Sequence, residues 1–250
     1  MNTEQVRAGI VIIGNEILSG RTQDTNVTHL AGVLNDWGIK IAETRIIPDD
    51  ESVIIDTVRH FSTSFDYVFT TGGIGPTHDD ITAVCIARAF HKKLVEHPDI
   101  ARLIRSRPAS EEVMKSRLLM ARVPEGSGLI ENPTGGPQGF FIENVYVMAG
   151  IPRVMQAMLS TLEGQLDGGL TVLSRSVTAF LGESQIAKEL GDLQQRYPLV
   201  DIGSYPFTRD SRYGTSIVIR CTDVSVLDQV LQETCKLIES AGGIPEDIHD

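Results

Sequence analysis

The sequence lacks the features of a membrane-spanning or secreted protein. Its 250 residues contain no apolar run close to the roughly 20 residues that span a bilayer. The N-terminal segment carries Glu4 before its first apolar run and has no small-residue cleavage site, so it predicts the start of a strand and not a signal peptide. We therefore expect a cytoplasmic protein that does not bind membranes.

Cysteine and basic residues are also scarce. The cysteines Cys85, Cys221 and Cys235 are odd in number and lie apart in apolar periodic segments, which predicts reduced core thiols and not a disulfide frame or a zinc site. The sequence has 22 Lys and Arg but 33 Asp and Glu, which gives a net charge of −11, and its basic residues form no cluster. Both features argue against nucleic-acid binding. An anionic ligand would need backbone amides, a local cation or a divalent metal.

Strand and helix patterns alternate through the first two thirds of the chain. Ala8 to Ile13 is a short β-branched run typical of a strand buried on both faces of a parallel sheet, and residues 24–38 repeat apolar side chains at helical spacing. This alternation predicts an α/β domain at 1–167 with a mostly parallel sheet covered on both faces. After a glycine linker, the order strand, helix, strand, strand, helix predicts a smaller α+β domain of split-βαβ type at 168–250.

The stretch TTGGIGPTHDD at 70–80 follows a predicted strand and opens a predicted helix over 79–90. Ligands bind at that end of a parallel strand, and the free amides of a helix start favour an anion. Gly72, Gly73 and Gly75 permit positive φ and close approach of a ligand, whereas Pro76 removes one donor. The stretch is neither a Walker A loop nor a Rossmann turn, because both glycine spacings are absent.

Two adjacent carboxylates, Asp79 and Asp80, end this turn and allow two interpretations. They cap the following helix, or at least one of them binds a divalent cation next to a phosphate. The residue types alone favour capping, because Asp is common at helix starts.

The turn resembles the pattern T-G-G-x-G-x-x-x-x-D-x-T of the molybdopterin-binding (MoaB/MogA-like) superfamily. Together with GNEILSGRTQDTN, IIPDD, MAGIP and GSYP in the same order, it is most similar to one branch of that superfamily. The branch comprises the N-terminal domain of competence/damage-inducible protein A and the corresponding domain of eukaryotic FAD synthases. The resemblance implies a three-layer α/β/α domain followed by a small, KH-like α+β domain.

The resemblance also implies an activity. Superfamily members in cofactor biosynthesis bind molybdopterin and adenylylate it, whereas members of this branch hydrolyse the pyrophosphate bond of FAD or ADP-ribose with a divalent metal. Our first hypothesis is therefore a pyrophosphatase that uses Mg²⁺, Mn²⁺ or Co²⁺ and releases AMP. The alternatives are a molybdopterin-binding or adenylylating protein and a non-catalytic nucleotide-binding module.

The site residues that the resemblance implies lie in loops after the predicted strands. The expected ligand-binding residues are Gly14, Asn15, Glu16, Asp24, Thr25, Asn26, Thr71, Gly72, Gly73, Gly75, Pro76, Thr77 and Gly150. The expected metal ligands are Asp80, Asp49 and Glu16, and the expected catalytic residues are Asp80, Asp49 and His78, whose imidazole suits a general base. The structural alternatives are a helix cap for Asp80 and for the Asp24 to Asn26 cluster, a turn or loop carboxylate for Asp49 and Glu16, and a solvated ring for His78.

The oligomeric state has two interpretations. Superfamily members commonly associate, and the apolar side chains of Phe140, Phe141 and Val145 suit either an interface of a homo-oligomer or a buried strand.

Overall fold

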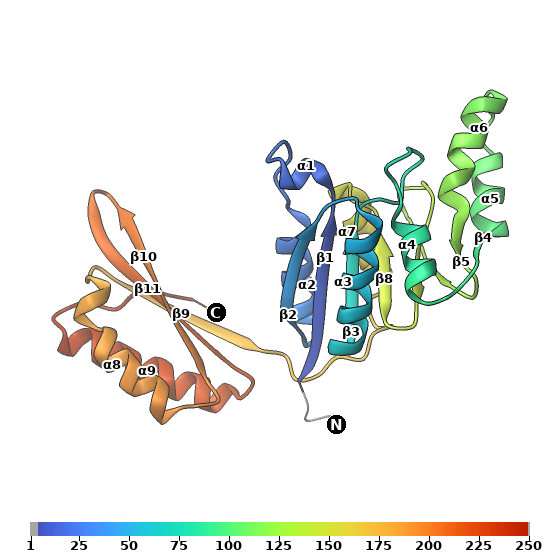
Figure 1. Ribbon diagram of the computed structural model, residues 1–250. Helices are drawn as coiled ribbons and strands as arrows, with labels where there is room; N and C mark the ends of the chain where they lie inside the picture. The colour runs from blue at the N-terminus through green and yellow to red at the C-terminus, as the bar shows by residue number, and fades with distance from the viewer. Residues whose placement is uncertain (1–4, 250) are drawn as a thin grey trace. The chain divides into compact units, whose positions relative to one another are not determined.

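The computed structural model describes residues 5–249 and forms two compact units, which divide between Leu170 and Thr171 (Figure 1). Each unit has its own sheet and its own hydrophobic core. Within the described residues, no helix combines the length and the hydrophobicity needed to cross a bilayer.

The first unit is built on a six-stranded sheet with the strand order β2-β1-β3-β8-β7-β6. The strands are β1 (Val6–Ile13), β2 (Ile39–Ile47), β3 (Tyr67–Thr71), β6 (Gly128–Ile130), β7 (Gly139–Ile142) and β8 (Val145–Met148). The four strands β2, β1, β3 and β8 run parallel, and β7 pairs antiparallel with both β8 and β6. The sequence therefore predicted the mostly parallel sheet correctly, and β1 is buried over nearly its whole length, as its β-branched run indicated.

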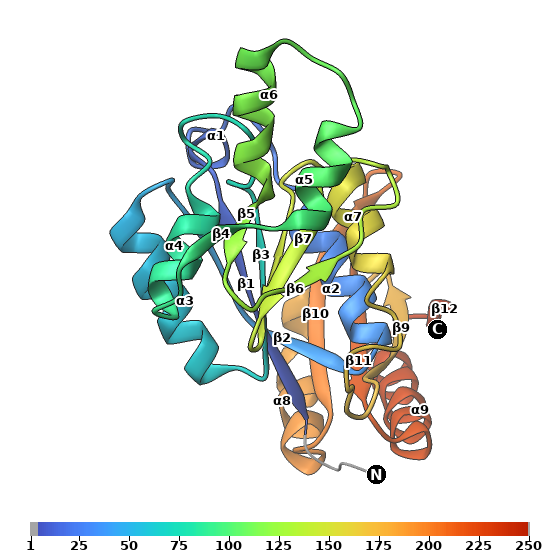
Figure 2. The ribbon, with the colours of Figure 1, turned by 90° about the vertical axis from the view of Figure 1, so that its right-hand side faces the viewer.

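Helices cover both faces of this sheet and complete the three layers (Figure 2). Helices α2 (Asn26–Asp36) and α7 (Pro152–Ser160) lie together on one face, where Leu30, Leu34 and Met155 enter the core. Helices α3 (Glu51–Ser64) and α4 (Thr82–Ala89) lie on the other face with Ile54 and Ile86. The chain thus leaves β1 toward one face and β3 toward the opposite face.

The remaining elements of the first unit are short. They are α1 (Asn15–Leu18), β4 (Leu94–Glu96), α5 (Pro98–Arg105), α6 (Glu111–Leu118), the 3-10 helix η1 (Leu119–Ala121) and β5 (Arg122–Pro124). Strands β4 and β5 form a separate antiparallel pair, and α5 and α6 extend beyond the sheet next to it (Figure 1). Ser110 caps α6 by accepting a hydrogen bond from the amide of Val113, at the break that the sequence indicated.

The second unit is a two-layer α+β structure. Its elements are β9 (Leu173–Ala179), the 3-10 helix η2 (Glu183–Gln185), α8 (Ala187–Arg196), β10 (Asp201–Arg209), β11 (Arg212–Cys221), α9 (Val224–Ser240) and β12 (Glu246–His249). Strand β11 pairs antiparallel with both β9 and β10 and separates them, which is the split-βαβ arrangement expected from the sequence. The edge strand β12 was not predicted, because its polar residues show no strand periodicity.

The buried positions settle two expectations about the core. Cys85 and Cys221 are buried free thiols, and Cys235 is a half-buried free thiol, so the prediction of reduced cysteines is confirmed. Burial raises the pKa of the Cys85 thiol to about 11. Phe140 and Val145 are buried within the sheet, which accounts for their apolar character without an interface and leaves the homo-oligomer a prediction.

Candidate functional site

The carboxyl ends of β1 and β3 are neighbours at the centre of the sheet, where the helices that follow them diverge to opposite faces. In open α/β sheets, this topological switch point is where ligands bind. The loop after β1 and the glycine turn after β3 therefore face a common position, and both were singled out from the sequence.

The glycine turn is packed so closely that it excludes side chains at two positions. Gly72 has φ 102°, and a Cβ atom there would lie 2.1 Å from the carbonyl oxygen of Ile13 at the end of β1. Gly73 has φ 67°, and its Cβ would lie 2.1 Å from Oγ1 of Thr82 at the start of α4. Glycine is thus required here both for backbone conformation and for space.

The same turn presents unpaired backbone donors. Among the described residues, the amides of Gly73, Ile74 and Gly75 donate no hydrogen bond. The carbonyl of Gly73 is instead occupied by the Thr82 amide at 3.0 Å, which holds the turn against α4. Consecutive free N–H groups at the end of a strand form a concave anion-binding surface. This turn can therefore hold a phosphate by its backbone alone.

Asp80 does not cap α4, contrary to what the residue types alone favoured. The helix begins at Thr82 and not at Asp79, and its first residues receive no side-chain cap. The Asp80 carboxylate instead closes the turn by accepting from the Thr77 amide at 2.8 Å and the Thr77 hydroxyl at 2.5 Å. The Asp80 carboxylate is thus held inside the turn and not at the helix start.

The Thr77 hydroxyl lies between two carboxylates. Its Oγ1 is 2.5 Å from an oxygen of Asp80 and 2.6 Å from Oδ1 of Asp79, and its hydrogen bond lowers the pKa of the Asp79 carboxyl. One hydroxyl hydrogen cannot serve both contacts at once, so the contact that it leaves unserved needs a proton or a cation between its two oxygens. Two carboxylates and a hydroxyl are the hard oxygen ligands that suit Mg²⁺ or a similar ion.

The three predicted metal ligands are not gathered into one group. Among residues 5–249, no set of three or more His, Cys, Asp or Glu side chains is placed to hold a metal ion. Asp49 accepts a hydrogen bond from the Asn15 amide at 2.9 Å and thereby ties the end of β2 to the loop after β1. Glu16 lies in α1, directly after β1, and lines a different hollow from the one that Asp80 lines.

That hollow is a cavity of about 60 Å³ between the loop after β1 and the start of α2. Its lining includes the predicted residues Glu16, Asp24, Thr25, Asn26, Thr71 and Gly150. Asp24 also accepts a hydrogen bond from the Val27 amide at 3.0 Å, so it caps the start of α2. A helix cap is the structural role that the sequence allowed for this residue.

Asn26 is a buried polar residue of this cavity, at 4% exposure. Its Nδ2 donates to the Gly150 carbonyl at 2.9 Å and to the Thr71 hydroxyl at 3.5 Å. Its Oδ1 is buried without a partner among the described residues. A buried acceptor that lacks a donor costs free energy, so this atom suits a ligand hydroxyl or amino group.

Gly150 also contacts the glycine turn. A Cβ atom at Gly150 would lie 3.2 Å from the Cα of Gly72, and the Gly72 amide donates to the Met148 carbonyl at 3.2 Å. The turns after β3 and β8 therefore touch through their backbones.

The other side of the glycine turn borders a second, smaller hollow of about 20 Å³. Gly75 and Asp80 line it together with Arg122, Gln138 and Phe140. His78 lies outside both hollows at the tip of the turn, where its ring is 97% exposed and its Nδ1 is 3.9 Å from Asp79.

Sequence reasoning overlooked several residues of this site. Thr82 is the last residue of the pattern T-G-G-x-G-x-x-x-x-D-x-T, so the pattern was a sufficient signal for it. Arg122 and Gln138 carry no such signal, because they reach the turn only through the pairing of β5 and the hairpin of β7 and β8.

The fold and the glycine turn define a MoaB/MogA-like α/β protein with a second small domain. Residues 9–167 match the family model of a probable molybdopterin binding domain, and residues 171–246 match that of the FAD synthase middle domain. The chain therefore belongs to the molybdopterin-binding domain family.

Individual relatives agree with this assignment. A protein of Archaeoglobus fulgidus is 37% identical over 79% of this chain and 84% of its own length. A CinA-like protein of Desulfosudis oleivorans is 34% identical over 76% of this chain, and a probable FAD synthase of Caenorhabditis elegans is 28% identical over 92%. The chain spans only about half the length of these last two proteins, 49% and 50%.

A solved structure has the same fold in the first unit. The crystal structure of CinA from Thermoplasma acidophilum is 30% identical, with a TM-score of 0.58 over 64% of this chain and 98% of that one. The match covers a share of the chain similar to that of the first unit.

Proposed function

We propose that this protein is a divalent-metal-dependent nucleotide pyrophosphatase that hydrolyses FAD or ADP-ribose to AMP and the other phosphorylated half. The observation that carries the proposal is the glycine turn, where the free amides of Gly73 to Gly75 lie beside the oxygen ligands of Asp79, Asp80 and Thr77. The combination suits a pyrophosphate, because one phosphate can bind the amides while a cation offsets the charge of the other.

The relatives support the same substrate class. One relative is named a probable FAD synthase, and the second unit matches the FAD synthase middle domain. A flavin dinucleotide contains both an adenosine and a pyrophosphate, and the free amides of the glycine turn suit the pyrophosphate.

Different residues of the site would bind different parts of the ligand. The amides of Gly73 to Gly75 hold one phosphate in a fixed position, and the unpartnered Oδ1 of Asn26 accepts a hydrogen bond from the nucleoside. Asp49 has a positioning role, because its carboxylate is already bound to the Asn15 amide.

Asp80, Asp79 and Thr77 would hold the metal. Mg²⁺ usually binds one or two carboxylates together with substrate phosphates, so a protein cage of three acidic residues is not needed. The bound ion would supply charge neutralisation at the pyrophosphate and a lowered pKa for a coordinated water. His78 is also a candidate general base. Because its ring is exposed at the tip of the turn, the turn would have to close over the ligand before the imidazole could contact the attacking water.

The test is direct detection of AMP. Purified protein is incubated with FAD, ADP-ribose or NAD in the presence of Mg²⁺, Mn²⁺ or Co²⁺, and products are separated by chromatography. We expect AMP from FAD or ADP-ribose with at least one metal, and none after chelation. The absence of AMP under every metal, with ligand binding intact, would instead support a non-catalytic nucleotide-binding module.

The family match itself favours one other function, molybdopterin binding with adenylylation. The same amides and the same cation would serve the pyrophosphate of an adenylylated pterin. Protein that binds molybdopterin and transfers AMP from ATP, yet leaves FAD intact, would establish this function in place of the first.

A further inference from the structure

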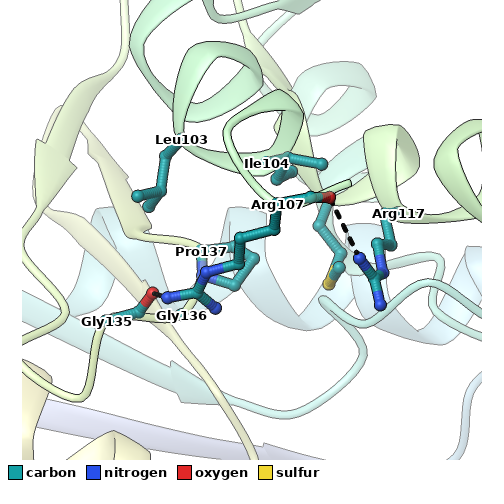
Figure 3. A pocket seen from close by; sticks show the side chains of 8 residues that line it. Leu103, Ile104, Arg107, Arg117, Gly135, Gly136 and Pro137 are labelled. Carbon is teal, nitrogen blue, oxygen red and sulfur yellow. Dashed lines mark hydrogen bonds between the residues drawn. The ribbon is translucent and has the colours of Figure 1, made fainter. Parts of the chain in front are cut away.

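A pocket of about 200 Å³ lies where α5, α6 and the loop 132–138 meet (Figure 3). Its apolar walls are formed by Leu103, Ile104, Met120 and Pro137. The guanidinium groups of Arg107 and Arg117 are the charged part of the lining. This combination of an apolar wall and two cations differs from both hollows at the glycine turn.

The two arginines lack the carboxylate partners that their neighbours have. Other cations of α5 and α6 form ion pairs with carboxylates. These pairs are Arg102 with Asp99 at 3.0 Å, Arg105 with Glu96 at 2.7 Å and Lys115 with Glu111 at 2.7 Å. Neither Arg107 nor Arg117 has a carboxylate within 4.0 Å anywhere in residues 5–249. In a chain of net charge −11, two unpaired guanidinium groups beside one pocket indicate a site for an anion.

Both side chains are held by backbone carbonyls and keep most of their donors free. Arg107 donates through Nη2 to the Gly135 carbonyl, and Arg117 donates through Nη1 to the Arg107 carbonyl at 3.5 Å (Figure 3). Asn132 fixes the loop that carries Gly135, because its Nδ2 donates to the Pro137 carbonyl at 2.9 Å. The guanidinium groups are therefore positioned before a ligand arrives, which lowers the entropic cost of binding.

The pocket is adjacent to the glycine turn. Met120 lines both this pocket and the hollow that contains Asp80, and Pro137 is the chain neighbour of Gln138 in that hollow. A ligand that extends from the turn past Asp80 is therefore directed toward the pocket.

We propose that the Arg107–Arg117 pocket binds the phosphorylated half of the dinucleotide that does not carry adenosine. The arginines recognise its phosphate, and the apolar walls accommodate the ring of a flavin better than a bare sugar. This assignment rests on the proposed function for the identity of the substrate, and the observation behind it is independent of the turn.

The experiment measures binding of the separate halves to the whole chain. FMN, ribose 5-phosphate and AMP are titrated into wild type and into Arg107→Met and Arg117→Met, with flavin fluorescence for FMN and calorimetry for the others. We expect each substitution to weaken FMN binding roughly ten- to hundredfold, because each removes a charge-assisted hydrogen bond, and to leave AMP binding unchanged. Arg102→Met is the matched control, because it removes the same charge from α5 outside the pocket, and it should bind FMN as wild type does.

The outcomes separate the pocket from the reaction. Arginine-dependent FMN binding without release of AMP from either FAD or ADP-ribose supports the pocket and overturns the hydrolase. Release of AMP by a protein whose FMN affinity is the same in wild type and both arginine variants overturns the pocket and leaves the hydrolase intact. Ribose 5-phosphate that binds as tightly as FMN would overturn the preference of the apolar walls for a flavin ring, and failure of both probes to bind wild type would overturn the whole proposal.

Discussion

Oγ1 of Thr82 donates a 2.9 Å hydrogen bond to the carbonyl oxygen of Gly72, and both residues are buried. The amide of Thr82 also donates to the Gly73 carbonyl at 3.0 Å. The first residue of α4 therefore binds two consecutive carbonyls of the glycine turn. Because the carbonyls point into the protein, the next amides of the turn are left to face a ligand.

Replacing Thr82 with Val should loosen this turn. The substitution keeps the shape of the side chain but leaves the buried Gly72 carbonyl without its partner, so we expect a loss of about 1–2 kcal/mol in the free energy of unfolding. Urea denaturation measures it, and Thr82→Ser, which retains the hydroxyl, should lose less. Equal losses in Val and Ser would show that packing of the methyl group matters and that the hydrogen bond does not.

Replacing Gly72 with Ala should be far more damaging than the same change at Gly126. Both glycines have positive φ, 102° and 85°, but a Cβ at Gly126 meets nothing within 4 Å, whereas one at Gly72 meets the Ile13 carbonyl. We expect about 1 kcal/mol of destabilisation at Gly126 from the backbone alone. We expect at least about 2 kcal/mol more at Gly72, where β1 and β3 must separate. Thermal unfolding of the two variants compares them, and similar melting temperatures would contradict the close approach.

Replacing Asp80 with Asn should remove turnover while the fold survives. The amide can still accept from the Thr77 backbone, but it no longer supplies a negative ligand for the proposed metal. We expect release of AMP from FAD or ADP-ribose to fall about 100-fold or more. Asp56→Asn, on the exposed side of α3, is the control for the lost charge. Hydrolysis at the wild-type rate by the Asp80 variant, with normal circular dichroism, would rule out this role.

The stability of the second unit should fall in acid partly through Asp223. This carboxylate caps α9, and hydrogen bonds from the Ser225 hydroxyl, then from the amides of Val226 and Ser225, lower its pKa in the folded state. A lowered pKa contributes stability at neutral pH, and that contribution is lost as pH falls from about 4 through the folded-state pKa. Asp223→Asn still caps the helix but does not titrate, so the urea midpoint should drop less between pH 5 and pH 3 than in wild type. An identical drop would exclude Asp223 as a source of the pH dependence.

Local periodicity was sufficient to predict the architecture. The β-branched run at Ala8 to Ile13 specified a buried parallel strand, and the apolar spacing of residues 24–38 specified the helix that covers it. These signals are local, because a strand or helix presents its apolar side chains at a fixed spacing along the chain.

The details of the site depend on contacts that local patterns do not contain. The residue types alone favoured a helix cap for Asp80, and only the resemblance assigned it to a metal; neither signal contains the hydrogen bonds that its carboxylate accepts from the Thr77 amide and hydroxyl. Arg107 and Arg117 are ordinary members of a charged segment in the sequence. They acquire significance only when the loop 132–138 folds against them.

The backbone contact between Gly150 and Gly72 has a consequence for observing this protein in solution. The Gly150 carbonyl accepts from the buried Asn26 side chain, and a Cβ atom at Gly150 would lie 3.2 Å from the Cα of Gly72, so this one residue is next to both parts of the site. An amide resonance at Gly150 would shift when a ligand occupies either the Asn26 cavity or the turn. The protein thus contains its own spectroscopic reporter, and a binding event can be followed at a residue that need not be altered or labelled with a dye.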